Sequence, residues 1–198
     1  AGSFGDFRYS NNPNLYLSSD AISEKNSYLG KTNLKGLKTG GGPQLAYSLG
    51  IEYNDPDYWW MQISTNYLSN NYLDTAPLLR TSNFYLDAEK MPYIDSETGR
   101  TVTPEQVRDL LKQQELDEIM LVNLVGGKSW KINDTYFGFF AAFNNLLGTE
   151  YRSGGFEQSR YANYPALKED RMRSKPIFGP KFWFGSKTTF YLNMYIKF

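Results

Sequence analysis

The chain has 198 residues, of which 40% are hydrophobic and 17% aromatic, and its 21 basic and 21 acidic side chains give a formal net charge of zero. It contains no Cys and no His, which excludes disulfides, Cys nucleophiles, Ser-His-Asp triads and imidazole or thiolate metal sites. The balanced charge gives no reason to expect a nucleic acid partner, and no run approaches the ~20 apolar residues of a membrane-spanning helix. A soluble all-β domain and a membrane β-barrel both remain open.

Two alternating strands joined by a tight turn are the first clear elements. From Gln44 to Tyr53, apolar residues alternate with polar and small ones, and the return strand from roughly Tyr58 to Asn70 does the same. Asn54-Asp55-Pro56-Asp57 supplies the turn. Trp59 and Trp60 follow it, where a membrane barrel places an aromatic girdle and a soluble hairpin would place core residues.

The segment from Asn71 to about Met120 loses this alternation and is expected to be a long loop that contains a short helix. Thr103-Pro104-Glu105-Gln106 combines an N-cap, a proline at the first helical position and a capping-box partner. Apolar residues then recur near helical spacing, which predicts an amphipathic helix near 104–118 that packs on the rest of the loop.

A second hairpin is expected from about Leu121 to Leu147, with Asn133-Asp134 as its turn and Trp130 beside it, as a third residue of the aromatic girdle. An irregular segment from Gly148 to Ser186 follows, and the last strand alternates strictly from Thr188 to Phe198. Short turns and long segments therefore alternate, as in a barrel with tight turns on one rim and loops on the other.

Several motifs occur in a characteristic order. They are Gly42-Pro43-Gln44, Tyr58-Trp59-Trp60, the run from Leu68 to Asp74, Gly127-Lys128-Ser129-Trp130, Asn144-Asn145-Leu146-Leu147, the run from Gly154 to Tyr161, and Phe178-Gly179-Pro180-Lys181 before the terminal strand. With these motifs the whole chain, residues 1–198, resembles the carboxyl-terminal portion of TonB-dependent outer-membrane receptors of the Bacteroidetes type.

This resemblance implies an all-β fold, the antiparallel wall of a transmembrane β-barrel in the bacterial outer membrane. The chain would supply about the last five or six strands of a 22-stranded barrel, so we expect a fragment whose plug domain and earlier strands lie elsewhere. Both tight turns would be periplasmic, and the segments around 10–43, 71–120 and 148–186 would be extracellular loops.

The function implied is uptake of a scarce nutrient, with no enzymatic chemistry and no cofactor. The implied partners are outer-membrane lipid, the rest of the barrel and its plug, the TonB motor, the barrel assembly machinery and a surface lipoprotein. The assembly machinery would engage an apolar signal on the last strand, formed by Phe190, Leu192, Met194, Ile196 and Phe198.

Two further sets of residues follow from this reading. Residues of the polar strand faces would line the lumen or form plain wall: Gln44, Ser48, Glu52, Gln62, Ser64, Asn66, Tyr191, Asn193 and Tyr195. Loop residues that offer stacking and charge-assisted hydrogen bonds would bind ligand or brace the loops: Tyr72, Asp74, Arg80, Arg152, Glu157, Gln158, Arg160 and Tyr161. Glu157 and Arg160, three residues apart, could pair with each other.

Two alternatives stay open. A soluble carbohydrate-binding β-sandwich would use exposed Tyr and Trp to stack on sugars. An outer-membrane barrel enzyme would use paired carboxylates such as Asp55 and Asp57, or Asp117 and Glu118, although such pairs in turns and on helices are usually solvated. The resemblance does not distinguish siderophore, glycan, peptide and cobalamin receptors, which share this wall.

Overall fold

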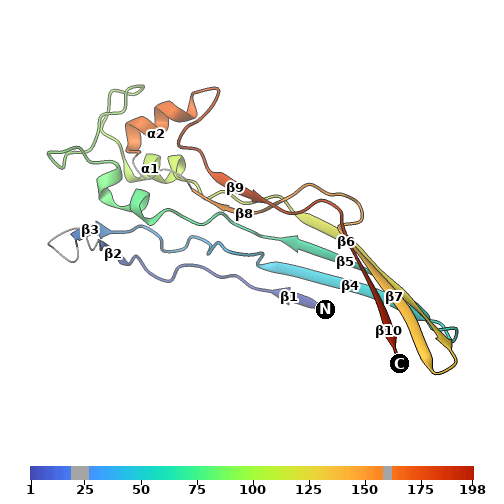
Figure 1. Cartoon of the computed structure of the whole chain (residues 1–198). Helices are drawn as coiled ribbons and strands as arrows, with labels where there is room; N and C mark the ends of the chain where they lie inside the picture. Colours follow the sequence, from blue (N-terminus) through green and yellow to red (C-terminus); the bar gives the residue numbers. More distant parts are fainter. Residues whose placement is uncertain (19–26, 158–161) are drawn as a thin grey trace.

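The computed structural model describes residues 1–18, 27–157 and 162–198, and its main element is a six-stranded antiparallel sheet (Figure 1). In spatial order the strands are β1 (Gly2–Phe4), β4 (Leu45–Asn54), β5 (Trp59–Ser69), β6 (Ile119–Ile132), β7 (Thr135–Asn144) and β10 (Thr189–Lys197). The predicted all-β class is confirmed, and the largest sheet of the described chain is antiparallel. The sheet is open, because within the described residues β1 and β10 each leave one edge unpaired.

Two tight turns join the long strands, as predicted. Between β4 and β5 the carboxylate of Asp55 accepts a hydrogen bond from the Asp57 amide at 2.9 Å, and the Asp55 amide donates to the Trp59 carbonyl at 2.8 Å. Between β6 and β7 the turn is Asn133-Asp134, and Asn133 has a φ of 54°, a conformation that Asn tolerates better than most residues.

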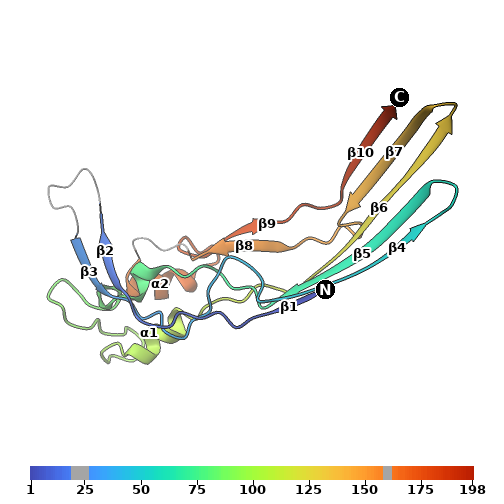
Figure 2. The same cartoon turned by 90° about the horizontal axis from the view of Figure 1, so that it is seen from below.

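The rest of the described chain lies at the other end of the long strands from these turns (Figures 1 and 2). We call it the loop cap, and it consists of the described parts of residues 5–43, 70–118 and 145–188. Its elements are β2 (Asn14–Leu17), β3 (Ser27–Lys31), two 3-10 helices η1 (Pro77–Arg80) and η2 (Ser82–Phe84), α1 (Pro104–Leu110), β8 (Arg152–Phe156), α2 (Tyr164–Arg171) and β9 (Lys181–Phe184). β2 pairs with β3, and β8 pairs with β9.

The main buried cluster belongs to the loop cap and not to the sheet. It consists of Leu79, Phe84, Val102, Leu111, Ala162, Tyr164 and Leu167. On the long strands, by contrast, Leu49 and Ile51 are each 68% exposed, and Phe190 and Met194 are each 75% exposed. The loops therefore have a core of their own, while the apolar strand residues are left uncovered in the described structure.

Helix α1 begins as predicted but ends early. Its capping box is formed, with the Gln106 amide 3.3 Å from Thr103 Oγ1 and the Thr103 amide 2.8 Å from Gln106 Oε1. The predicted continuation to residue 118 is wrong, because the chain from Leu111 onward pairs with the segment that follows β5. The Leu73 amide donates to the Gln114 carbonyl, and the Leu116 amide to the Asn71 carbonyl.

Helix α2 lies in a segment that was expected to be irregular. Its N-cap is Asn163, whose side chain accepts a hydrogen bond from the Ala166 amide at 3.1 Å, and Pro165 lies in its first turn. Asn163-Tyr164-Pro165 is thus a start signal that the sequence analysis missed. Within the described ranges, no helix has the length and apolar content required to cross a membrane.

Candidate functional site

The strand register sorts the sheet into one apolar face and one mainly polar face, called the polar face below, which also carries Trp60, Leu68, Ile119, Leu121, Val125 and Phe140. On β4 the apolar face carries Leu45, Tyr47, Leu49, Ile51 and Tyr53. Residues in register with these on the other long strands are Trp59, Met61, Ile63, Tyr67, Met120, Val122, Leu124, Trp130, Ile132, Phe137, Phe139, Ala141, Phe143, Phe190, Leu192, Met194 and Ile196. Polar or small interruptions are few, and they are Thr65, Ser69, Gly126, Lys128 and Thr135.

Aromatic pairs lie toward both ends of this apolar face. Near the tight turns the rings of Tyr53 and Trp59 are 5.0 Å apart, and Trp130 packs 5.9 Å from Phe139. Toward the loop cap, Tyr47 stacks on Tyr67 at 6.5 Å, and Phe143 lies 6.4 Å from Phe190. Aliphatic residues such as Leu49 lie between the two sets.

The girdle assignment needs one correction. Trp60 is in register with Asn54 and Gly127, on the polar face, whereas Trp59 and Trp130 are on the apolar face. The reason is geometric, since adjacent residues of a strand point to opposite sides.

Four of the five predicted assembly-signal residues lie on the apolar face of β10, which pairs with β7 and leaves its other edge unpaired within the described residues: Phe190, Leu192, Met194 and Ile196. Phe198 follows the strand and is 95% exposed.

The residues expected to face the lumen share the polar face, with one exception. Ser48, Glu52, Gln62, Ser64, Asn66, Tyr191, Asn193 and Tyr195 all lie on it by register. Gln44 precedes β4 and is only 5% exposed, and its side chain bonds the backbone of Phe7 and Thr39. Its role is therefore to fasten the loop cap to the sheet.

The predicted ligand-binding residues are divided among several places in the loop cap. Tyr72 lies under the Lys38 ammonium, 5.6 Å from the ring centroid, and burial together with neighbouring Glu115 raises the pKa of its hydroxyl. Arg152 stacks on the Phe182 ring at 4.3 Å. Gln158, Arg160 and Tyr161 lie outside the described residues, and so does the suggested pairing of Glu157 with Arg160.

Three of these predicted residues, Asp74, Arg80 and Glu157, do come together. Arg80 and Glu157 form a buried ion pair at 2.6 Å, with side chains 6% and 15% exposed. The other Glu157 carboxylate oxygen accepts from the Ala76 amide at 2.9 Å, and the Glu157 amide donates to the Asp74 carbonyl at 3.1 Å. This cluster braces η1 against the end of β8.

A cavity of about 460 Å³ opens in the loop cap beside this cluster. It lies among the end of β3 with the segment after it, η1 and η2, and helix α1 with its C-terminal extension. Five cationic residues line it, and no acidic residue does so in the part of the chain that the structure describes: Lys31, Lys35, Arg80, Arg108 and Lys112. Of these, sequence reasoning singled out only Arg80, because the others are spread over some eighty residues without a local motif.

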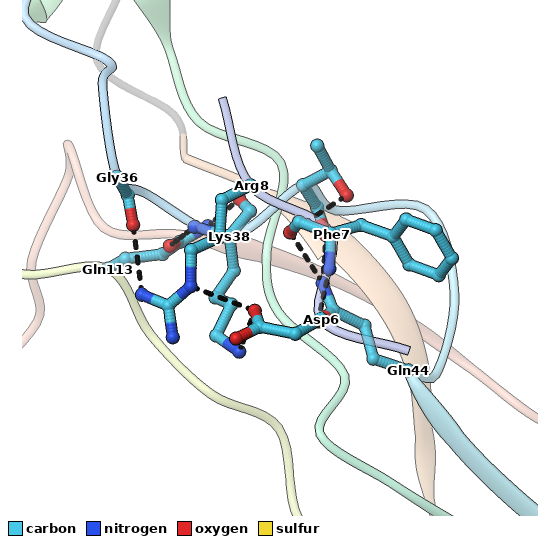
Figure 3. Close-up of polar contacts among 8 residues, drawn as sticks. Asp6, Phe7, Arg8, Gly36, Lys38, Gln44 and Gln113 are labelled. Carbon is cyan, nitrogen blue, oxygen red and sulfur yellow. Dashed lines mark hydrogen bonds and ion pairs between the residues drawn. The ribbon is translucent and has the colours of Figure 1, made fainter. Parts of the chain in front are cut away.

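A polar junction positions one wall of this cavity (Figure 3). The Asp6 carboxylate bonds Arg8 at 2.8 Å and Lys38 at 2.7 Å, and these cations hold the pKa of Asp6 below its usual range. Gln113 accepts from the Lys38 amide at 2.9 Å and donates to the Lys38 carbonyl at 2.7 Å. These two hydrogen bonds hold the segment from Lys35 to Lys38 beside the chain that follows α1, and Gln113 itself lines the cavity.

A second polar cluster holds α2 to the segment around Asp95, which is 2% exposed. Lys168 donates to Asp95 at 2.8 Å and also contacts Glu97. This hydrogen bond from Lys168 lowers the pKa of Asp95, with further help from the amides of Thr98 and Glu97 and against the effect of burial. The same contacts raise the pKa of Lys168. The cluster therefore fixes α2 against the segment around Asp95.

The acidic pairs considered for catalysis lie apart from each other, in the β4–β5 turn and just before β6. Asp55 is occupied in its turn, where Tyr53 donates to it at 2.9 Å, and Asp117 and Glu118 are exposed at the start of β6. Across residues 1–18, 27–157 and 162–198, no group of three or more acidic side chains is arranged to hold a metal ion.

Comparisons of this chain with protein-family models, with curated proteins and with solved structures found no match.

Proposed function

We propose that this chain is a wall segment of a transmembrane β-barrel and forms the carboxyl-terminal part of an outer-membrane receptor of the TonB-dependent type, which imports a scarce nutrient. The observation that carries the proposal is the uncovered apolar face of the sheet. In water, such a face would lack cover, whereas lipid solvates it directly.

The lengths of the strands support the same proposal. A tilted strand needs about 9–11 residues to cross a bilayer. The five long strands have 10, 11, 14, 10 and 9 residues. Aromatic pairs at both ends of an aliphatic band match the girdles of membrane barrels. Loops at one end and tight turns at the other fit extracellular and periplasmic rims respectively.

A soluble sugar-binding β-sandwich is less well supported. A sandwich buries one face of each sheet against a second layer about 10 Å away. In the described residues, the only other sheets are the two-stranded pairs β2–β3 and β8–β9, and both belong to the loop cap. Neither covers the apolar face.

The open edges of β1 and β10 are where the remaining strands of the barrel would pair. An exposed row of unpaired backbone groups cannot remain in lipid, because no water satisfies it there. We therefore propose that other strands complete the barrel and enclose the plug, and that the polar face of this sheet lines the lumen.

The test uses the absence of native cysteine in this chain. In the native protein, with any cysteine outside this chain replaced by serine, single cysteines are placed at Ser48, Leu49, Gly50, Ile51 and Glu52 and labelled with an environment-sensitive fluorophore. After reconstitution with nitroxide-labelled lipid, quenching is expected to be strong at Leu49 and Ile51 and weak at the other three positions. Extraction of the protein with outer membranes and heat-modifiable migration are expected alongside.

Each alternative gives a different pattern. A soluble sandwich stays in solution without detergent and shows no lipid quenching at any of the five positions. Quenching of all five positions equally would mean that β4 lies flat on the bilayer and does not form a wall. Either result removes the proposal.

A further inference from the structure

The cavity of the loop cap carries more positive charge than its surroundings neutralise. Arg80 is paired with Glu157, and Arg108 with Glu105 at 3.0 Å. Lys31, Lys35 and Lys112 have no carboxylate within ion-pair distance in the part of the chain that the structure describes. Three ammonium groups around one cavity repel one another, and a bound anion would relieve that repulsion.

The other residues of the cavity indicate what kind of anion fits. Leu37, Tyr85, Val107 and Leu111 provide an apolar wall, and Asn33 and Ser82 provide neutral hydrogen-bonding groups. An inorganic ion would leave the apolar wall unused. A volume of about 460 Å³ lies within the range of about 300–1,000 Å³ that is typical of small-molecule sites.

The cationic residues are held on anchored segments. Lys31 ends β3, and Lys35 lies just before the Lys38 backbone that Gln113 clamps. Arg108 lies in the last turn of α1, whose start is fixed by its capping box, and Lys112 follows the buried Leu111. Because the backbone is fixed on both sides, ligand binding would have to order mainly the exposed cationic side chains.

We propose that this cavity binds a small organic polyanion, a molecule with two or more carboxylate or phosphate groups on an apolar body. Its lining residues belong to the loop cap. The loop cap lies at the end of the molecule away from the tight turns (Figure 2), so the cavity is separate from the apolar face of the long strands. That the bound anion is the imported nutrient rests on the proposed function. Binding itself does not.

The probe is trimesate, a benzene ring with three carboxylates, and its uncharged counterpart is the corresponding triamide. Binding to the intact, detergent-solubilised protein is measured by calorimetry. The test variant is Lys31→Gln/Lys35→Gln/Lys112→Gln. The control Lys90→Gln/Lys175→Gln/Lys181→Gln removes the same charge from exposed lysines of the loop cap that do not line the cavity.

Trimesate is expected to bind and the triamide is not, and binding should weaken as salt screens the charges. The cavity variant should weaken trimesate binding by about tenfold or more, given the usual strength of charge-assisted hydrogen bonds. The control should stay within about twofold, since its lysines could act only through screened long-range attraction. Both variants change exposed side chains, and circular dichroism checks that they fold.

Three outcomes would overturn the inference. They are no trimesate binding at millimolar concentration, equal weakening in the cavity and control variants, and equal binding of the triamide. The lipid-quenching experiment on β4 tests separately whether the sheet is part of a membrane-spanning wall. If the labelled protein is quenched by lipid but does not bind trimesate, the proposed function stands and the anion site is contradicted. If the protein is soluble and binds trimesate, the anion site stands and the uptake function is contradicted.

Discussion

The ring of Tyr195 on β10 lies over Gly138, its partner in register on β7. A Cβ atom at Gly138 would be 2.5 Å from both Cζ and Oη of Tyr195, so only glycine leaves room for the ring. The Tyr195 hydroxyl is also 2.5 Å from Ser129 Oγ on β6. One side chain therefore links three neighbouring strands across the polar face of the sheet.

Replacing this glycine tests the contact. In Gly138→Val, Tyr195 must rotate away and lose its bond to Ser129, which is expected to lower the free energy of unfolding by about 1–3 kcal/mol. Gly50→Val is the matched control, because a Cβ there meets nothing closer than 3.6 Å. Urea unfolding in detergent measures both, and equal destabilisation of the two variants would show that the ring contact is unimportant.

Asn145, in the Asn144-Asn145-Leu146-Leu147 motif, holds the chain between β7 and β10. Its buried side chain donates to the carbonyls of Thr149 and Ser186 at 2.8 and 3.0 Å and accepts from the Thr149 amide at 3.0 Å. Its φ of 51° also favours Asn over Ala. Asn145→Ala is expected to lower the free energy of unfolding by about 2–4 kcal/mol, because several hydrogen bonds of a buried side chain are lost.

The neighbouring residue provides the comparison for Asn145. Asn144 is exposed, and its side chain makes one long hydrogen bond to Thr189 at 3.5 Å. Asn144→Ala should change the unfolding free energy by less than about 0.5 kcal/mol. If the midpoint temperature of thermal unfolding falls by the same amount in both variants, the network around Asn145 is not what joins these strands.

Breaking the Arg80–Glu157 pair should loosen the loop cap. Glu157→Gln leaves a buried guanidinium without its countercharge, at an expected cost of about 3 kcal/mol. The pair Arg173–Glu169 is exposed, so Glu169→Gln should cost at most about 1 kcal/mol. Hydrogen exchange of residues 74–80 reports the loss, and unchanged protection in Glu157→Gln would refute a bracing role.

The stability of the loop cap is expected to fall in acid. The hydrogen bond from Lys168 lowers the pKa of Asp95. Burial disfavours the charged form of Asp170 and would raise its pKa, but the hydrogen bonds from the amides of Ile177 and Phe178 outweigh that effect, so the pKa of Asp170 is lowered. Between the folded pKa of these carboxyl groups and their unfolded value of about 4, the unfolded chain binds more protons than the folded chain. The contribution of the two carboxylates to stability is therefore fully present above this window and is lost as the pH falls through it.

Lys168 has the opposite dependence. Its raised pKa means that its contribution is complete below the unfolded value of about 10.4 and is lost as the pH rises through the folded pKa. The loop cap should therefore be most stable across the neutral range. Proteolysis of the cap as a function of pH measures this, and Asp95→Asn should flatten the acid limb. An unaltered acid limb would mean that Asp95 does not contribute to it.

The sequence by itself was sufficient for the long strands, both tight turns and the start of α1. Each depends on residues close together in the chain: apolar residues at every second position, Asp55 and Asn133 in their turns, and Thr103 with Gln106 in the capping box. Such interactions need no distant partner, so a short window of sequence contains the information. The same local rule separates Trp59 from Trp60, and the girdle assignment overlooked it.

Contacts between distant segments decided the rest. Helix α1 ends at Leu110 because the following chain pairs with residues after β5. Glu157 bonds Arg80, which is 77 positions away in the sequence. Gln44 is buried, and its side chain bonds the segment that contains Phe7. The cationic cavity likewise gathers Lys31, Lys35, Arg108 and Lys112 from separate loops. No local periodicity encodes these pairings, because they form only when the loops pack around their own apolar core.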